Sequence, residues 1–490
     1  HGGADTSMAA VVSHDPRGLV DTTPGGAVNE EAASLARELS AGGLAASRTE
    51  LNLKKAGLSD LSPRISALAS LTKLDVSLNG LKSLPSEVAS LASLRILFSL
   101  GNLFEEVPPV LRVLPALYML SFKSNKLARI AEEALPPTIE WLILTDNQLT
   151  SLPRSIGQCA NLRKCMLTNN QLAALPDEMV SHCRQLELIR LADNQLTALP
   201  AGFWAMPKLA WVGLAGNPLV ALADSPQPPR SVMPGELDIG EQLGCGGGGF
   251  VHSARWSAQP DEPVVALKIF RDAGTVTDGD PAHEIEISTA LTHPNVIRVL
   301  GAMPKPQPGL VLELLQLDRG NSGVGWSELG LPPNFDTCAR DTYPEGAAWG
   351  ASFVLKALAG VADACAHLHG LHISHGDLYA HNTMVRNDGE AKVGDFGAAY
   401  NYSALGKATA PHVERVEVRA FGCLAEELAM RLVTDGPAHE ALQAGLLNLA
   451  REIWMGAEVA ARPGFAEARA QLEVLARLTL TLTQTLTLTL

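Results

Sequence analysis

Two features in the second half of the chain have the residue types and spacing needed to hold a phosphate group. The run from Gly244 to Val251 fits G-x-G-x-x-G-x-V and stands between two strand-like segments. Glycines lack side chains, so their backbone amides can approach phosphate oxygens closely. Lys268 follows Val251 by 17 residues and ends a Val-Ala-Leu-Lys segment. Alone, the glycine run is a weak signal, because a glycine-rich hairpin or a dinucleotide-binding loop gives a similar pattern.

Carboxylates and an amide follow in an order that suits metal-assisted phosphoryl transfer. The segment His375–Asn382 reads H-G-D-L-Y-A-H-N, and Asp395 opens an Asp-Phe-Gly triplet 13 residues after Asn382. This chemistry needs one carboxylate to orient an incoming hydroxyl group, while an amide and a second carboxylate hold metal ions that bridge the phosphates. Each motif alone is usually a loop or a turn. The evidence is therefore their order along about 150 residues.

Together these motifs resemble the protein kinase superfamily, over residues 236–478. The resemblance implies an α+β bilobal fold that uses ATP and Mg²⁺ to phosphorylate protein hydroxyl groups, with serine and threonine as the expected acceptors. It makes Lys268, Asp377 and Asn382 the catalytic set, in which Lys268 binds the ATP phosphates and Asp377 is the base. Asn382 and Asp395 are the expected Mg²⁺ ligands. The phrases H-G-D-L-Y-A-H-N and D-F-G-A-A are similar to those of soluble leucine-rich-repeat kinases of bacterial and plant intracellular type.

The resemblance also assigns residues around the nucleotide. Glu284 is the expected partner of Lys268 because it precedes His293 by nine residues, and Glu286 is the alternative. A strand and hinge at residues 310–315 would lie against the adenine. The phrase Glu417-Val-Arg-Ala-Phe-Gly, similar to the D-V-W-S-F-G helix of kinases, adds late support. The expected ATP-binding set is Gly244, Gly246, Gly249, Val251, Ala266, Lys268, Glu284, Glu313 and Leu315.

Two residues of the expected catalytic loop depart from the family pattern. Gly376 replaces the arginine that usually precedes the catalytic aspartate and binds an activation-loop phosphate, which predicts activity without such phosphorylation. Tyr379 stands where serine/threonine kinases usually carry a phosphate-contacting lysine. These departures motivate the alternative function, a kinase-like scaffold (a pseudokinase) that binds nucleotide and mediates protein interactions.

The segment after the Asp-Phe-Gly triplet is also unusual. It is short, and Ala410-Pro-His412 replaces the usual A-P-E phrase. Arg462 is therefore expected to lack its usual glutamate partner, and Glu414 is a candidate substitute.

Internal repetition dominates residues 48–222. Seven asparagines recur at intervals of 22 to 24 residues, each at the end of an L-x-x-L-x-L-x-x-N-like phrase, and one worn copy precedes them. The pattern resembles the leucine-rich-repeat family and predicts an α/β solenoid of eight repeats behind a helical cap. Inward leucines form the core only when repeats stack, and the asparagine satisfies backbone groups at the turn. The seven are Asn79, Asn102, Asn125, Asn147, Asn170, Asn194 and Asn217.

Outward positions on the concave sheet lie six and four residues before each asparagine. Eight of these fourteen positions are apolar, which ordinary strand preference would also explain. A contiguous exposed apolar stripe more often marks a binding surface, so we expect a protein partner there. The eight residues are Ile96, Phe98, Met119, Trp141, Ile143, Met166, Leu188 and Trp211.

The expected domain boundaries follow from these patterns. Residues 1–29 form a disordered arm, residues 30–222 the repeat domain, residues 223–235 a Pro-rich linker, and residues 236–478 the kinase domain. Residues 479–490 alternate Leu and Thr, a low-complexity tail that we expect to favour β structure.

Composition narrows the partners and the compartment. A net charge of −14 argues against nucleic acid as a partner. Seven scattered cysteines without a C-x-x-C pair indicate free thiols and a reducing compartment, so we expect a cytoplasmic protein. We expect no membrane span, because no apolar run approaches the roughly 20 residues that a span requires. A receptor fragment is disfavoured because the short Pro-rich junction leaves no room for a span between the domains.

Overall fold

The computed structural model describes residues 28–220, 230–246, 248–258, 264–271, 278–316 and 325–489. The expected arm lies outside the described residues except for its last two, and so does the first part of the expected linker, through residue 229. Helix α1 (Glu30–Ala41) opens the described chain, where the Asn29 side chain accepts a hydrogen bond from the Ala32 amide as an N-cap.

The repeat region forms one parallel sheet of eight short strands in chain order. Each strand pairs with the next about one repeat later, so Leu51 stands beside Leu74 and Leu74 beside Leu97. These central residues point inward and are buried. The strands are β1 (Glu50–Asn52), β2 (Lys73–Asp75), β3 (Ile96–Phe98), β4 (Met119–Ser121), β5 (Trp141–Ile143), β6 (Lys164–Met166), β7 (Leu188–Arg190) and β8 (Trp211–Gly213).

Short helical turns carry the chain back between strands. Pro precedes or opens most of these turns, which suits the fixed φ of proline at a helix start. They are η1 (Pro63–Ala67), η2 (Ser86–Ser90), η3 (Pro109–Val113), η4 (Arg154–Gln158), α2 (Asp177–His182) and η5 (Phe203–Ala205).

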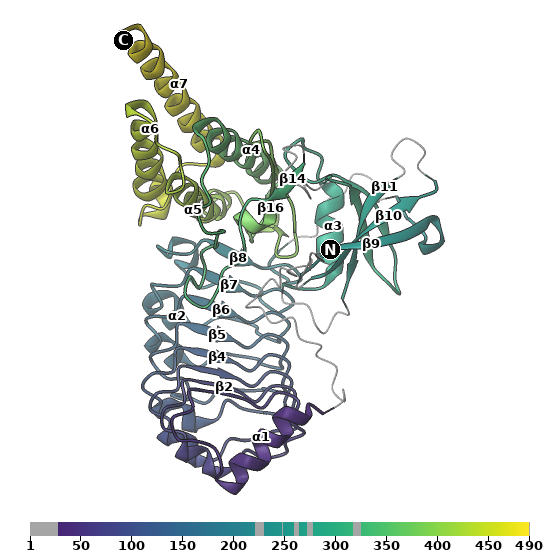
Figure 1. Cartoon of the computed structure of the whole chain (residues 1–490), viewed down its shortest axis with the longest axis vertical. Coiled ribbons are helices and arrows are strands. Elements are labelled where there is room, and N and C mark those ends of the chain that lie inside the picture. Colours follow the sequence, from purple (N-terminus) through teal and green to yellow (C-terminus); the bar gives the residue numbers. More distant parts are fainter. Residues whose placement is uncertain are drawn as a thin grey trace, which may run out of the picture.

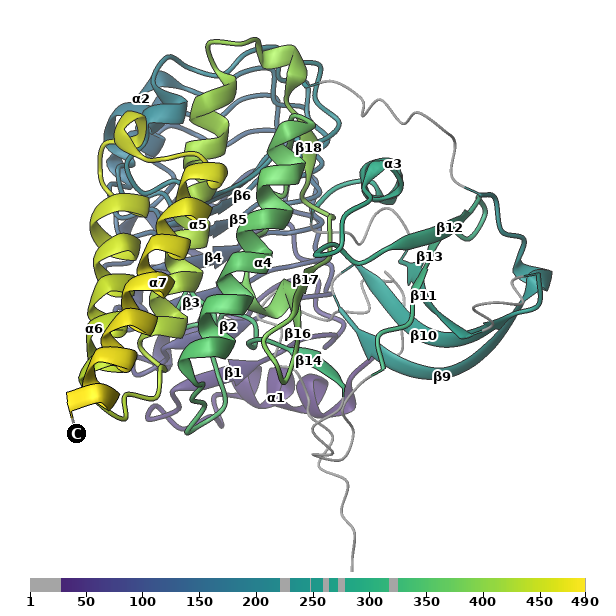
Figure 2. The ribbon, with the colours of Figure 1, turned by 90° about the horizontal axis from the view of Figure 1, so that it is seen from above.

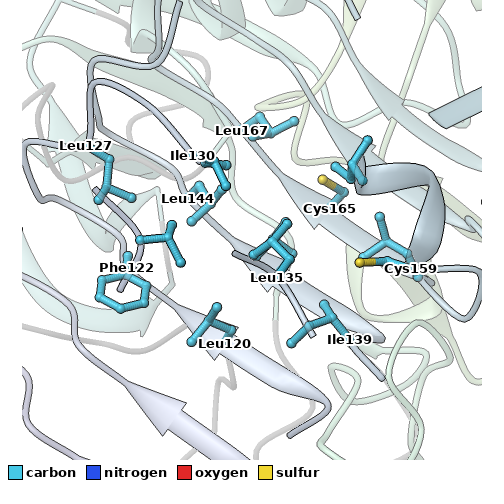
Figure 3. Packing of buried hydrophobic residues seen from close by; sticks show 14 of the residues in the cluster. Leu120, Phe122, Leu127, Ile130, Leu135, Ile139, Leu144, Cys159, Cys165 and Leu167 are labelled. Carbon is cyan, nitrogen blue, oxygen red and sulfur yellow. The ribbon is translucent and has the colours of Figure 1, made fainter. Parts of the chain in front are cut away.

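The repeat asparagines connect neighbouring repeats. The Asn102 side chain donates to the Val76 carbonyl (3.0 Å) of the preceding repeat and to Ser99 (3.2 Å) of its own. Its oxygen accepts from the Leu81 amide at 3.0 Å. Buried backbone groups at each turn are thereby paired, as the sequence predicts. Figure 3 shows how leucines, isoleucines and two cysteines from successive repeats gather in the interior. All seven cysteines are free, and only Cys245 among them is exposed.

A five-stranded antiparallel sheet in the order β12-β13-β11-β10-β9 and helix α3 (Pro281–Ala290) form a second unit, here called the sheet lobe. Gly249 is needed where β10 crosses β11, because a Cβ there would lie 3.0 Å from the Ile269 carbonyl carbon. The strands are β9 (Leu237–Cys245), β10 (Gly249–Trp256), β11 (Val264–Phe270), β12 (Val299–Met303) and β13 (Gly309–Glu313), after the turn η6 (Pro234–Glu236).

The helical lobe comprises the described residues from 325 onward. Its helices are α4 (Ala351–Gly370), α5 (Ala410–Ala429), α6 (Pro437–Asn448) and α7 (Phe465–Thr489), with a π turn η10 (Leu449–Trp454) and 3-10 turns η8 (Ala380–Asn382), η9 (Ser403–Leu405) and η11 (Val459–Ala461). Its strands are β14 (Trp326–Glu328), β16 (Thr383–Arg386) and β17 (Ala391–Val393), and the pair β15 (Ile373–Ser374) and β18 (Tyr400–Asn401).

The prediction of β structure for the Leu/Thr tail is wrong, because α7 continues through it to Thr489. Leucine is a good helix former, and tertiary or helical context overrides the β preference of threonine.

One helix departs from the expectation that no apolar run approaches the length of a membrane span. Helix α4 has the length and mean hydropathy of a membrane span, and half of its apolar window is buried inside the protein.

The repeat sheet lies against the helical lobe rather than apart from it. Figures 1 and 2 show α4 and α5 above strands β4–β8, with the sheet lobe to one side near the last repeats. One apolar cluster contains strand residues such as Met119 and Trp211 together with Leu358, Phe421 and Trp454 of the helical lobe. The two domains therefore share a hydrophobic core.

Candidate functional site

A partly buried lysine and two carboxylates meet where the sheet lobe faces the helical lobe. Lys268 on β11 donates to Glu284 on α3 at 2.5 Å and to Asp395 at 3.2 Å. The Glu284 side chain is only 7% exposed. Burial raises the pKa of Glu284 to about 7 despite the neighbouring Lys268. The two carboxylates outweigh the effect of burial on Lys268 and raise its pKa, so the ammonium group stays charged.

The glycine-rich hairpin lies over this lysine. Val251 pairs with Gly244 on one side and with Lys268 on the other, which joins the two ends of the motif in one sheet. The Cβ position of Gly248 is 3.7 Å from Lys268 Nζ. A Cβ added at Gly244 or Gly246 would meet nothing within 4 Å, so both glycines border open space. The hairpin therefore leaves room above Lys268 for a group that its backbone amides could bind.

The remaining expected nucleotide residues lie along the same sheet. Ala266 pairs with Leu312, next to Glu313 at the end of β13. The Glu313 carboxylate binds Lys392 at 2.6 Å and the Arg298 amide at 2.8 Å, and the Glu313 amide donates to the Arg298 carbonyl at 2.9 Å. Leu315 is half-buried just beyond β13. Lys268 thus pairs with Glu284, whereas Glu286, the alternative partner, lies two residues further along α3 and acts on His283.

The segment His375–Asn382 forms a buried loop where the helical lobe meets strands β7 and β8. The Asn382 amide donates to both the Asp377 carbonyl (2.8 Å) and its carboxylate Oδ2 (3.0 Å). His375 donates to the Gly394 carbonyl (3.0 Å), which ties the loop to the Asp-Phe-Gly segment. The structure thus brings Asp377, Asn382 and Asp395 into one site, with Asp377 only 5% exposed.

Glu417 on α5 binds the backbone of this loop through its carboxylate. Its carboxylate accepts hydrogen bonds from the Gly376 amide (2.6 Å), the His375 amide (3.1 Å) and the Ser374 hydroxyl (3.0 Å), and from His369 (2.7 Å). Burial alone would raise the pKa of Glu417, but the bonds from His369 and Gly376 hold it below its usual value. A buried carboxylate of α5 therefore holds the backbone of the loop, a role that the sequence reasoning did not assign to Glu417.

The residues present fit Mg²⁺ and ATP. The described residues contain no cluster of three or more carboxylate, histidine or cysteine side chains that could hold a metal ion by themselves. Mg²⁺ usually takes one or two protein ligands and completes its shell with phosphates and water, and Asn382 with Asp395 supplies that number. The Asn382 amide nitrogen is used within the loop, which leaves the amide oxygen for a metal. Lys268 supplies a fixed cation for phosphate.

The expectation of an exposed apolar stripe on the concave sheet is wrong. Six of its residues are buried in the core shared with the helical lobe, and Ile96 and Phe98 are half-buried against it. Phe335 lies 6.1 Å from the rings of both Phe98 and Trp141, so the segment after the hinge covers this face. The six buried residues are Met119, Trp141, Ile143, Met166, Leu188 and Trp211.

Arg190 of β7 reaches the catalytic loop, which the sequence reasoning missed. Its Nε donates to Asp278 (2.9 Å) and its Nη1 donates to the Gly376 carbonyl (2.9 Å). Its Nη2 forms an ion pair with Asp377. The Arg190 side chain is 2% exposed. One signal was available, because Arg190 is the only arginine among the fourteen outward positions of the repeats.

Asp193, in the turn after β7, contacts the start of α3. Its Oδ2 accepts from the Asp280 amide (2.7 Å) and its Oδ1 from His283 Nε2 (2.9 Å). The bond to Asp193 raises the pKa of His283 above its ordinary value of 6.5. Asp280 and Glu286, the other charged groups facing His283, act in the same direction.

This pair predicts a pH dependence of stability. A histidine whose folded-state pKa is raised adds stability that is complete below its unfolded pKa and is lost as the pH rises through the folded value. We expect the melting temperature of wild-type protein to exceed that of His283→Gln most at pH 6 and below. The difference should shrink above pH 6.5. Thermal melts from pH 5.5 to 8.5 measure it, and a constant difference across that range would contradict the prediction.

Arg462 does not pair with Glu414. Its guanidinium donates to the carbonyls of Gly456 (2.8 Å), Arg415 (3.3 Å) and Pro207 of the repeat region (2.6 Å). The Glu414 carboxylate accepts instead from the Phe465 amide at 2.8 Å. Burial lowers the pKa of Arg462 to about 10. Because the segment before α5 is short, a carbonyl of the repeat region, that of Pro207, accepts one of the hydrogen bonds of this arginine.

Family models match both regions of the chain. The model described as protein tyrosine and serine/threonine kinase matches residues 237–426, and a leucine rich repeat model matches residues 160–219. The chain therefore has a region of the protein kinase superfamily, residues 237–426, and a leucine-rich-repeat region. Residues 237–426 include both the lysine site and the catalytic loop described above.

Several curated kinases are similar to this chain at low identity. Serine/threonine-protein kinase Aurora-2 of Arabidopsis thaliana is 30% identical over 165 residues, which cover 33% of this chain and 51% of the relative. Aurora kinase B-A of Xenopus laevis is 25% identical over 248 residues, covering 47% and 63%. Tyrosine-protein kinase Btk of Drosophila melanogaster is 26% identical over 202 residues, covering 38% and 22%. The chain therefore spans less than two thirds of the length of each of these relatives.

Proposed function

We propose that this protein is an ATP-dependent protein kinase that transfers the γ-phosphate to serine and threonine hydroxyl groups. The observation that carries the proposal is the assembled ion pair between Lys268 and Glu284, 2.5 Å apart, with Asp395 3.2 Å from the same lysine. Residues from three separate segments meet there in the arrangement that phosphoryl transfer requires. Similarity to a kinase named as serine/threonine-specific supports that acceptor class, although a tyrosine kinase also matches.

Bound ATP and Mg²⁺ would supply the transferable phosphoryl group and the charge that neutralises it. In the chain itself, Lys268 would bind phosphate oxygens, and Asn382 and Asp395 would hold the metal. Asp377 would orient the acceptor hydroxyl and take its proton, since the two histidines of the loop are engaged by the Gly394 carbonyl and by Asp341. The apolar stripe expected to bind a partner is covered, so recruitment of protein substrates is proposed instead for the exposed surfaces of the repeat region.

The proposal is tested by measuring phosphate incorporation into casein from γ-labelled ATP with Mg²⁺. We expect labelling by wild-type protein and a loss of at least about 100-fold in Asp395→Asn, because a metal ligand is replaced by a weaker one. The Asp395 side chain is 47% exposed, so this isosteric change should leave the fold intact. Equal labelling by both proteins, or none by the wild type toward casein or itself, would count against a kinase.

One observation favours the second candidate, a nucleotide-binding scaffold. The Asp377 carboxylate is only 8% exposed, and the repeat region lies over it. A scaffold of this kind would be stabilised by ATP in a thermal melt and would show no phosphate incorporation. The labelling assay combined with that melt separates the two functions.

A further inference from the structure

A single repeat contacts both halves of the phosphotransfer site. Arg190, the last residue of β7, binds the catalytic loop through the Gly376 carbonyl and the Asp377 carboxylate. Asp193, three residues later in the turn, binds the Asp280 amide and His283 at the start of α3. Helix α3 carries Glu284, the partner of Lys268. The same short segment thus touches the loop that holds the base and the helix that positions the phosphate-binding lysine.

Two residues of the catalytic loop, Gly376 and Tyr379, allow its close contact with the repeat region. Gly376 has a φ of 72°, and a Cβ there would lie 2.5 Å from the Val212 carbonyl of β8. Any side chain at this position would therefore collide with the repeat sheet. Tyr379 stacks flat on Trp211, with ring centroids 4.6 Å apart and planes 4° apart. Both departures from the kinase pattern thus accommodate the repeat region.

The turn places Asp193 and Gly216 beside His283. Asp193 has a φ of 53°, a left-handed conformation that recurs at this position of other repeat turns, as at Asp146 and Asn169. Gly216, in the next turn, has a φ of 72°, and a Cβ there would lie 2.7 Å from His283 Nε2. A side chain at Gly216 would therefore crowd the ion pair between Asp193 and His283.

Electrostatics shows what each residue can do. Within residues 375–382, the loop itself has no lysine or arginine, and its His381 is directed to Asp341 at 2.7 Å. Arg190 places a buried guanidinium between Asp278 and Asp377, where two carboxylates would otherwise repel each other. Its fork geometry also fixes the direction of the Asp377 carboxylate relative to the loop backbone. Arg190 thus holds the Asp377 carboxylate in a fixed orientation.

We propose that Arg190 and Asp193 are positioning residues that hold the catalytic loop and helix α3 in their assembled arrangement. This inference rests on the proposed kinase function. In many kinases a phosphorylated loop supplies the charge that orders these elements. Here two charged side chains of the repeat domain supply it permanently. The repeat domain is therefore a built-in part of the catalytic centre, and the kinase needs no activating phosphorylation.

The test compares full-length variants by kcat and KM for ATP with casein as acceptor. Arg190→Met should lower kcat by about 100-fold, because a base misplaced by about 1 Å loses that much, and should leave KM for ATP within about two-fold. Arg190→Lys should recover part of the loss because it restores the charge without the fork. Asp193→Gly should raise KM for ATP about ten-fold, since α3 and Glu284 lose their anchor.

Two matched controls are available in the repeat domain. Arg129→Met removes an arginine from an exposed ion pair with Glu106. Asp146→Gly changes the same position of the turn two repeats earlier, where φ is 58° and the carboxylate accepts from Asn169. Both variants should keep wild-type kcat and KM.

Each outcome decides between the alternatives. If Arg190→Met and Asp193→Gly both kept the kcat and KM of wild type, the two residues would have only a structural role and the proposal would be overturned. Activity above wild type in either Arg190 variant would instead identify Arg190 as a clamp that blocks the base, and would also overturn it. Should Arg190→Met fail to fold, Asp193→Gly at a partly exposed site and Arg190→Lys carry the decision. A wild-type protein without any transfer overturns the kinase function itself, and the positioning roles fall with it.

Discussion

Replacing Asp377 by asparagine is expected to lower kcat by about 100- to 10,000-fold, the range that a positioned general base contributes. The asparagine has the same shape but takes up no proton from the acceptor hydroxyl. Asn382, which donates to Asp377 Oδ2 at 3.0 Å, can still donate to the amide oxygen of the variant. The single side-chain oxygen of asparagine cannot accept from Arg190 at the same time, so the ion pair of Arg190 with Asp377 is lost. The nucleotide site keeps all of its own residues.

The affinity for ATP should therefore stay within about three-fold of wild type, because the Lys268 pair is untouched. Equilibrium binding of a fluorescent ATP analogue measures affinity, and phosphate incorporation measures kcat. Asp388→Asn is a matched control, since Asp388 lies in the same domain and pairs with Arg386 and Lys356 at the surface. Full activity in Asp377→Asn would remove Asp377 from catalysis, whereas a joint loss of activity and ATP affinity would indicate a damaged fold.

The nucleotide half of the site was largely predictable from the sequence. The glycine run, Lys268 and Glu284 lie in short adjacent strands and one helix, where local patterns decide their place. The catalytic loop was predictable from its motif, whereas the binding of its backbone by Glu417 was not predicted. The repeat asparagines gave the strand spacing because each satisfies backbone groups of two neighbouring repeats.

The covering of the concave face was not predictable by the same reasoning. Outward apolar residues indicate that something binds, but they do not say whether the partner is another protein or a later part of the chain. The Arg190–Asp377 pair joins residues 187 positions apart, and the Asp193–His283 pair joins residues 90 positions apart. Such contacts depend on how two domains dock. The unusual residues Gly376 and Tyr379 are consequences of that docking. The sequence shows that they depart from the kinase pattern, but only the structure shows that they contact Val212 and Trp211.

Replacing Trp211 by alanine is expected to lower the free energy of unfolding by about 3–5 kcal/mol, the usual cost of truncating a buried tryptophan. Trp211 is 2% exposed at the centre of the interface between the repeat sheet and the kinase domain. Its indole nitrogen donates to the Leu378 carbonyl at 2.9 Å, and its ring covers Tyr379. The variant leaves a cavity, an unpaired carbonyl and an uncovered tyrosine in the loop that carries Asp377.

Urea unfolding followed by circular dichroism measures the loss, with Trp204→Ala as the control. Trp204 belongs to the same repeat domain but is only partly buried, packed edge-on against Phe203 with centroids 5.0 Å apart. Its truncation should cost less, about 1–2 kcal/mol, because less apolar surface returns to water. In wild-type protein the two domains should unfold in one transition, since they share an apolar core. Trp211→Ala should divide that transition in two and reduce kcat, while Trp204→Ala should do neither. Equal costs for the two variants, with a single transition in both, would show that the domains are held together elsewhere.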